Sequence, residues 1–179
     1  MRTQRKTPAF EAVVSTIEKE EIGILLGCLV VVSLRSYIGM SVGFPWKSTL
    51  FAGAVAVLAV ILGKVAGGFA AAGAGIGRTV VVSLLLSSLC YMFSQNMVAG
   101  VLALFLFNMT MPITLYLLVQ KLKGLAGFSF GVLTFGLFLG FLPTYLGVHI
   151  PVDGRVLGCM GSILSLVILW FCVRKYNKA

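Results

Sequence analysis

Arg35 is the residue whose type and position point most directly to chemistry. It lies near the middle of an apolar run of residues 22–44. Its guanidinium cannot practically be neutralised, and its planar fork of N–H groups suits a carboxylate or a phosphate. A charge at that depth is costly and should face protein or a wet cavity. Two interpretations follow: Arg35 anchors an anionic or polar substrate in a central cavity, or it is a structural tether to helix-end carbonyls or to an acid elsewhere.

A second group of polar residues lies in the apolar run 96–119. Pro112 removes a backbone hydrogen bond and favours a kink, and Asn108, four residues earlier, shares its helical face. Thr110 and Tyr116 lie in the same apolar run. A polar, kinked helix can line a pathway, or its Asn and Thr side chains can bond a neighbouring helix. We expect Asn108, Thr110 and Tyr116 to line the cavity that holds Arg35, with Pro112 shaping it.

Other kinds of chemistry have little support. No Asp or Glu lies at mid-membrane depth, so the chain lacks an obvious proton relay. The Gly-rich stretch 73–79 follows no strand, which argues against a nucleotide-binding loop. We find no Ser/His/Asp set, HExxH motif or paired carboxylates, and the four cysteines have no metal-ligand spacing and indicate apolar packing. We therefore expect no enzyme activity, no metal and no cofactor.

The elements that carry these residues are apolar and long. Of 179 residues 59% are hydrophobic and 11% charged, against roughly 25% charged in soluble domains. Mean hydropathy is +1.06. A spanning helix needs about 20 apolar residues, and helices satisfy their own backbone groups in lipid. We predict an all-α integral membrane fold: a cytoplasmic N-terminal segment 1–21, a six-helix domain 22–173 and a cytoplasmic tail 174–179. The predicted helices are 22–44, 49–71, 77–93, 96–119, 126–147 and 155–173, the third being short.

The cations predict an orientation. One side of the six spans would hold only Lys47 and Arg155, whereas the other would hold eleven Lys and Arg residues. This positive-inside bias places both termini in the cytoplasm, in the cell (inner) membrane. The net charge of +9 does not indicate nucleic-acid binding, because the cations sit at the ends of apolar runs and form no stripe interleaved with aromatics. The eleven are Arg2, Arg5, Lys6, Lys19, Lys64, Arg78, Lys121, Lys123, Arg174, Lys175 and Lys178.

Glycines spaced by four residues recur in the second and fifth spans. Small residues at this spacing allow two helix backbones to approach closely. We expect tight helix contacts at these positions, either within one bundle or between subunits that slide during transport. The predicted packing glycines are Gly63, Gly67, Gly127, Gly131, Gly136 and Gly140.

Segment 63–78 resembles a degraded form of the cytoplasmic signature of the major facilitator superfamily, in which Gly and Asp precede a Gly-Arg run. Gly67, Gly68, Gly75 and Arg78 carry the likeness, and Ala72 stands where the family has Asp. Segments 34–37 and 128–143 are similar to the C-terminal half of fosmidomycin-resistance-type exporters. The resemblance covers residues 22–173.

This resemblance implies a six-helix half built from two inverted three-helix repeats. The first and fourth helices would line the cavity, and the second and fifth would face another half. Gly67, Gly68, Gly75, Arg78 and Pro112 would serve the conformational change. Because full carriers have about twelve helices, the chain would pair with its own copy or with a complementary half, and would move a small polar or anionic solute through the lipid membrane. The alternatives are a non-transporting scaffold or assembly subunit, one half of a split transporter, or a pore.

Overall fold

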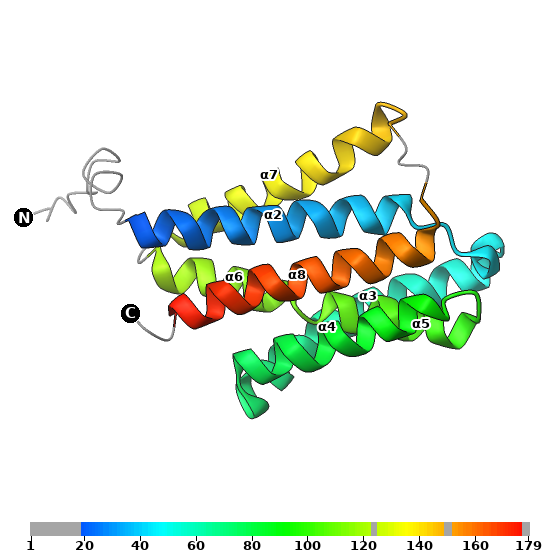
Figure 1. Cartoon of the computed structure of the whole chain (residues 1–179), viewed down its shortest axis with the longest axis horizontal. Helices are drawn as coiled ribbons and strands as arrows, with labels where there is room; N and C mark the ends of the chain where they lie inside the picture. The colour runs from blue at the N-terminus through cyan, green and yellow to red at the C-terminus, as the bar shows by residue number, and fades with distance from the viewer. Residues whose placement is uncertain (1–18, 123–124, 149–151, 177–179) are drawn as a thin grey trace, which may run out of the picture.

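The computed structural model describes residues 19–122, 125–148 and 152–176, and in these three ranges it contains helices and no strand (Figure 1). The N-terminal segment as far as residue 18, Lys123 and the last three residues lie outside the described ranges. The helices are α2 (Lys19–Ser41), the 3₁₀ helix η1 (Pro45–Ser48), α3 (Leu50–Ala74), α4 (Ile76–Met92), α5 (Met97–Asn108), α6 (Met111–Lys121), α7 (Ala126–Tyr145) and α8 (Gly154–Tyr176).

The helices indicate a multi-pass membrane protein. Within the described ranges five helices are long and apolar enough to span a membrane when α5 and α6 count as one. The remaining one, α4, has 17 residues, which confirms the prediction of a short third span. The ends of all six predicted runs agree with the observed helices to within three residues. The all-α class and the apolar spans are therefore as predicted.

The fourth span is broken rather than only kinked. Pro112 lies in the first turn of α6 and has no N–H to donate to the carbonyl of Asn108. The backbone turns at Met109, whose N–H donates to the Leu106 carbonyl over 3.2 Å, and helical bonding resumes where Thr114 N–H donates to Thr110 O over 3.1 Å. The regular helical bonding is therefore interrupted near the middle of the span, where a tighter turn and two side chains bond the carbonyls of Leu104, Leu106 and Phe107.

Segment 63–78, which carries the family resemblance, is helical except at Gly75, and α3 extends three residues beyond its predicted end at residue 71. Gly67 and Gly68 lie inside α3, and Lys64 lies on the exposed surface of that helix. Gly75 alone separates α3 from α4, with a φ of +89° that L side chains rarely adopt. Arg78 lies in the first turn of α4. The apolar composition explains the extension, since in lipid a helix satisfies backbone groups that a loop would leave bare.

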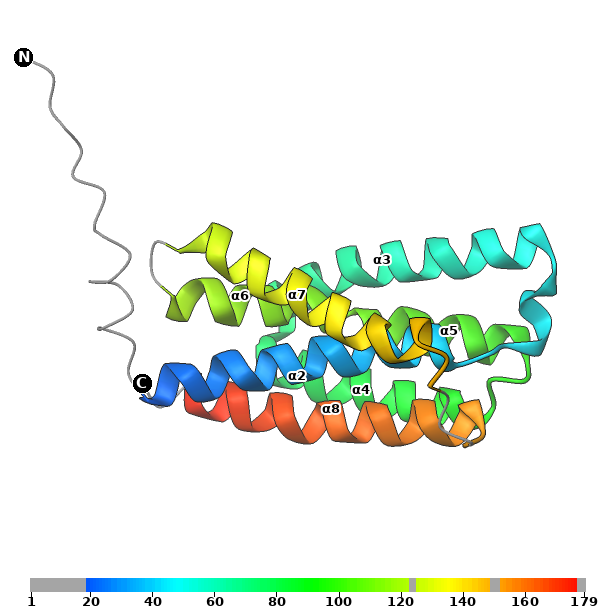
Figure 2. The ribbon, with the colours of Figure 1, turned by 90° about the horizontal axis from the view of Figure 1, so that it is seen from above.

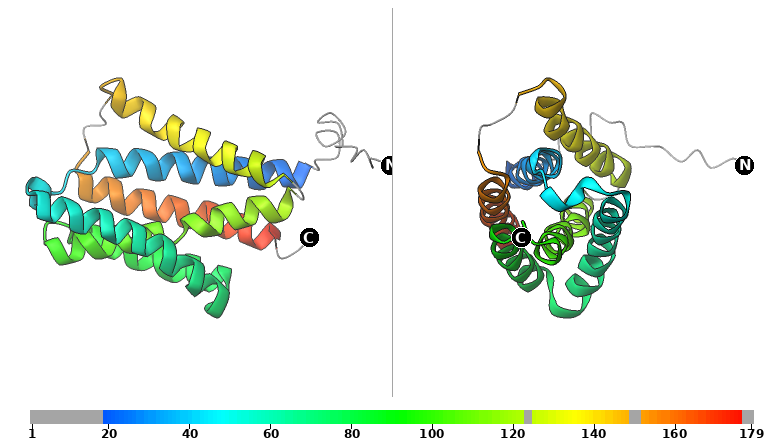
Figure 3. Two further views of the ribbon diagram at one scale, coloured as in Figure 1. Left: turned by 180° about the vertical axis from the view of Figure 1, so that it is seen from behind. Right: turned by 90° about the vertical axis from the view of Figure 1, so that its right-hand side faces the viewer.

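The six spans form one bundle in which helices distant in the sequence are neighbours. The principal contacts are α4 with α8, α2 with α7, α3 with α5, α4 with α5, and α2 with α8. In the end-on view, α2 lies between α7 and α8, while α3 and α7 form two edges of the bundle (Figure 3). Helices α2 and α7 run in the same direction, as do α3 and the α5–α6 pair (Figure 2). Each of these same-direction pairs also forms one of the principal contacts of the bundle.

Two of the three predicted glycine pairs lie against the backbone of a neighbouring helix. Gly63 and Gly67 of α3 face the carbonyl oxygens of Phe105 and Met109 so closely that a methyl group would collide with them. The absence of a side chain at both positions therefore sets how closely α3 approaches the broken fourth span.

A similar contact between glycines and backbone carbonyls joins α7 to α2. Gly140 faces the carbonyl of Ser33 without room for a methyl group, whereas a methyl group on Gly136 would lie 3.3 Å from the Leu29 carbonyl oxygen. The third pair, Gly127 and Gly131, is exposed, and a methyl group there would meet nothing within 4 Å in the described part of the chain. This pair makes no contact inside the bundle.

The two ends of the bundle differ in charge. One end, which we call the cation-rich end, carries Arg78, Lys121, Arg174 and Lys175 at the termini of α4, α6 and α8. The other, which we call the opposite end, carries Lys47 in η1 and Arg155 in α8. The spans therefore alternate in direction as the positive-inside count assumes.

Candidate functional site

Arg35 is buried at the break in the fourth span. It projects from α2, and only 6% of its surface is exposed. Its Nη2 donates a hydrogen bond to the Thr110 hydroxyl, and its guanidinium carbon lies 5.5 Å from the centre of the Phe107 ring. The turn between α5 and α6 thus supplies a hydrogen-bond acceptor for a side chain 75 residues earlier in the chain.

The environment of Arg35 is only partly complementary to a positive charge. Thr110 is fully buried, and its hydroxyl donates to the Phe107 carbonyl over 3.1 Å. The C-terminal end of a helix carries partial negative charge, and the face of an aromatic ring attracts a cation. However, no carboxylate pairs with Arg35, because Arg155–Asp153 is the one ion pair within the described ranges. The buried Nε of Arg35 has no hydrogen-bond partner there either.

The remaining predicted site residues are not all brought to Arg35. Asn108 is buried, but its side-chain amide donates to the Leu104 carbonyl of its own helix over 2.8 Å. Tyr116 is 45% exposed and contacts Tyr176, with 6.3 Å between the ring centres. The structure therefore joins Arg35 with Thr110, commits the Asn108 side chain to its own helix, and places Tyr116 elsewhere.

Tyr116 lines a separate cavity of about 490 Å³ between α3, α4 and α6. Two other residues singled out in the sequence, Gly68 and Pro112, share its wall, together with Ala71, Ala72, Ile76 and Ile113. The lining is mostly apolar and does not include Arg35. The predicted single cavity is thus divided into a buried charged centre and a neighbouring apolar space.

A row of aromatic rings connects the Arg35 centre to the opposite end. The Phe107 ring lies 5.9 Å from that of Tyr91, which lies 6.4 Å from that of Phe44. Phe44 in turn lies 5.1 Å from Trp46, whose indole N–H donates to the Ser94 carbonyl over 3.0 Å. Sequence reasoning missed these rings. The signal available for Phe107 was its place one turn before Thr110.

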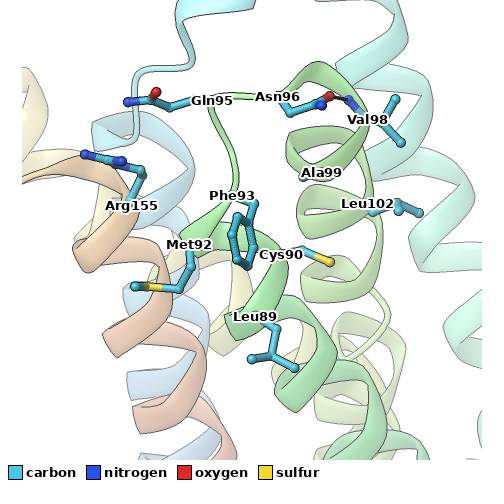
Figure 4. Close-up of a pocket in the computed structure, with 10 residues that line it drawn as sticks. All are labelled: Leu89, Cys90, Met92, Phe93, Gln95, Asn96, Val98, Ala99, Leu102 and Arg155. Carbon is cyan, nitrogen blue, oxygen red and sulfur yellow. Dashed lines mark hydrogen bonds between the residues drawn. The ribbon is translucent and has the colours of Figure 1, made fainter.

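A larger cavity of about 600 Å³ lies at the opposite end between α4, α5 and α8 (Figure 4). Gln95, Asn96 and Arg155 are its polar or charged lining residues, apart from the Cys90 thiol. Arg155 is engaged by Asp153, with 2.6 Å between Nη2 and Oδ2. The hydrogen bond from Arg155 holds the pKa of Asp153 below its ordinary value. The charge of this surface arginine is therefore compensated by a carboxylate, whereas that of Arg35 is not.

The chemistry that this arrangement offers is anion binding at Arg35. A buried guanidinium with an unused N–H can accept an anion, and no group of three or more potential metal ligands occurs in the described ranges. Searches of protein families, of curated proteins and of solved structures find no match to this chain. The resemblance to the major facilitator superfamily consequently stays a prediction.

Proposed function

We propose that the chain is a half-size transporter of the major facilitator type, which forms a dimer and moves a small polar or anionic solute by alternating access. The observation that carries this proposal is a symmetry in the packing. Exchanging the first three spans for the last three converts the α2–α7 contact into α3 with α5, and α2–α8 into α4 with α5. The contacts of α4 with α8 and of α2 with α6 convert into themselves. Inverted three-helix repeats would produce this pattern.

The glycine joints obey the same exchange. Gly63 and Gly67 lie against carbonyls four residues apart on the fourth span, and Gly136 and Gly140 lie against carbonyls four residues apart on the first. Contacts between consecutive helices, α3–α4 and α6–α7, have no counterpart of similar extent. The exchange therefore relates the contacts between helices distant in the sequence, and not the contacts between consecutive helices.

Arg35 supports the choice of solute. Broken helices near the middle of the membrane form binding sites in carriers, because their ends expose backbone dipoles. Here the break faces a guanidinium that has no acid partner in the described ranges and an unbonded Nε. A carboxylate or phosphate group would complete its hydrogen bonds and compensate its charge. Entry of such a solute requires α6 to move about the break, since Arg35 is almost entirely buried.

Pairing supports the half-size assignment. Six helices leave wide apolar surfaces on α3 and α7, including Phe69, Phe130 and Phe135, and Gly127 with Gly131 lies uncovered on α7. We propose that a second copy covers these helices in a parallel dimer. The cation-rich ends of both copies would face the cytoplasmic side of a bacterial-type inner membrane. Asn108, Thr110 and Tyr116 would line the opened route in that assembly.

Reconstitution in liposomes tests the proposal. The purified chain should show saturable uptake of at least one of acetate, inorganic phosphate and methylphosphonate, and native mass measurement should show a dimer. Arg35→Ala should abolish that flux and Arg35→Lys should retain part of it, whereas Arg155→Ala at the opposite end should leave it unchanged. Equal flux in the wild-type chain and in both Arg35 variants would refute the assignment.

A second candidate is a membrane scaffold or assembly subunit without transport. The observation that favours it is the close burial of Arg35, which lines none of the cavities described above and bonds to Thr110 as a tether would. A scaffold predicts a stable chain with no flux of any of the three anions and a loss of stability when Arg35 is removed. A split transporter predicts flux only when a complementary half is present.

A further inference from the structure

A small cavity at the cation-rich end combines two arginines with a tryptophan. It measures about 240 Å³ and lies between the start of α4 and the end of α8. Its lining residues are Gly77, Arg78, Trp170, Val173 and Arg174. The two arginines come from different spans that form one of the principal contacts of the bundle. Their proximity is therefore a product of the fold and not of the sequence.

The positive charge of this cavity is uncompensated. Arg78 and Arg174 are both exposed, and neither forms an ion pair within the described ranges. The described acid that does pair with an arginine, Asp153, lies at the opposite end. Two arginines that line one cavity and have no ion-pair partner in the described ranges favour a ligand with several negatively charged oxygens, and the fork of arginine matches phosphate in particular.

The backbone at this point leaves room for such a ligand. Gly77 has no side chain, and a methyl group there would lie 3.8 Å from Val173. The first hydrogen bond of α4 is donated by Thr79 to the Gly75 carbonyl over 3.1 Å, so the N–H groups that precede it have no partner within the helix. Helix N-termini with free N–H groups favour anions, which adds to the effect of the two side chains.

The surroundings indicate a lipid rather than a dissolved ion. Trp170 is 44% exposed, close to the end of an apolar span, where tryptophan typically marks the membrane interface. Phe171 and Val167 extend an exposed apolar surface along the same helix. A ligand held by Arg78 and Arg174 would therefore have its polar head at the interface and apolar chains along α8.

We propose that this cavity binds the phosphate headgroup of an anionic phospholipid, with Arg78 and Arg174 as its ligands and Trp170 beside the glycerol region. Basic pockets between spanning helices are suited to such headgroups. The site joins α4 to α8, and its test measures lipid binding rather than flux, so it stands or fails separately from the function proposed above. The larger cavity at the opposite end supplies an internal contrast, because its single Arg155 is neutralised by Asp153.

Native mass spectrometry of the full chain in mild detergent tests this site. We expect phosphatidylglycerol to bind far better than phosphatidylcholine and to raise the Tm. Arg78→Gln with Arg174→Gln should weaken phosphatidylglycerol binding by roughly 30-fold, as the loss of two interfacial cations implies. Lys47→Gln with Arg155→Gln removes the same charge at the opposite end and should leave the affinity unchanged.

Several results would overturn the proposal. They are equal binding of the two lipids, unchanged phosphatidylglycerol binding by the Arg78/Arg174 variant, and equal weakening by the control variant. Inorganic phosphate that competes with the lipid at equal concentration would identify a free-anion site instead. If the double variant does not fold, Arg78→Gln and Arg174→Gln are measured singly, and each should weaken binding by about 5-fold.

Discussion

The crossing of α2 with α7 and the crossing of α3 with α5 are built alike, yet the helices that the glycines face differ. Those helices are α2 in the first crossing and α5 in the second. In both, a pair of glycines four residues apart lies against two backbone carbonyls. The helix that receives the glycines is continuous in one case and broken in the other, since α2 runs unbroken past Arg35 while α5 ends at Asn108. The same kind of contact thus lies beside a buried cation on α2 and beside a helix end on the fourth span.

The two crossings also differ in tightness. Both glycines of α3 lack room for a methyl group, whereas on α7 this holds for Gly140 and not for Gly136, which lies nearer the cation-rich end. The contact of α3 with the broken span is therefore close at both glycines, whereas the contact of α7 with α2 is close at Gly140 and looser at Gly136.

The largest effect should come from filling the tight positions. Gly67→Leu and Gly140→Leu each place a side chain where a backbone carbonyl now lies, and each should lower the free energy of unfolding by about 3 kcal/mol. Denaturation in mixed detergent micelles measures this. The matched control is Gly39→Leu on the exposed surface of α2, where a methyl group would meet nothing within 4 Å, and it should change stability by less than about 0.5 kcal/mol. A clearly destabilised Gly39→Leu chain would show that the loss is not specific to the tight positions.

Replacing the buried charge should have the next largest effect, and in the opposite direction. Arg35→Met keeps an unbranched chain and removes a charge that has no acid partner in the described ranges, so it should raise the free energy of unfolding by about 2 kcal/mol. Anion flux should disappear at the same time. Arg35→Lys retains the charge and should not be stabilised. If Arg35→Met is clearly less stable than the wild-type chain, Arg35 is a structural tether and the scaffold alternative gains support.

A single methyl group should distinguish the two crossings. Gly63→Ala collides with the Phe105 carbonyl, whereas Gly136→Ala comes within 3.3 Å of the Leu29 carbonyl. Alanine improves helix propensity by about 1 kcal/mol over glycine. We therefore expect Gly63→Ala to lose about 1 kcal/mol and Gly136→Ala to be neutral or slightly stabilised, as judged by Tm in detergent. Equal losses would show that the two crossings are equally tight.

The smallest effect should come from the exposed pair at the opposite end, far from both crossings. The pKa of Asp153 is lowered by Arg155, so the pair stabilises the fold above the ordinary pKa of Asp, and this contribution is lost as the pH falls through the lowered pKa. Because both side chains are exposed, solvent screens the interaction. Asp153→Asn should leave the Tm at pH 7 unchanged, and a loss of several degrees would reveal a role for this pair that its exposure does not explain.

Much of the fold could be predicted along the chain. The run 77–93 was recognised as short, and Pro112 indicated an interruption of the fourth span, because backbone bonding and span length are local properties. The strength of the interruption was underestimated: a kink was expected, and the helix ends at Asn108 and resumes at Met111. The predicted helix 49–71 already included Gly67 and Gly68, and α3 continues three residues beyond it to Ala74.

The site depended more on neighbours than on sequence. Arg35 and Thr110 were both identified as polar residues within apolar runs, but no pattern indicated that Phe107 would lie under the guanidinium or that Tyr116 would line another cavity. Likewise the pairs Gly127/Gly131 and Gly136/Gly140 have the same spacing on the same helix, and one is covered while the other is not. Spacing within one helix carries no information about which helix packs against it.

The sequence by itself determined that this is an all-α chain of apolar spans, where each span begins and ends, and that its cations gather at one end. In hydrocarbon a segment must satisfy its backbone hydrogen bonds internally and can carry few charges. Both requirements apply to each segment separately. Only the tertiary structure decided which glycines are covered, that Arg35 meets a broken helix, and that Arg78 and Arg174 converge. In lipid the solvent is as apolar as the protein core, so the sequence cannot mark which face of a span points inward.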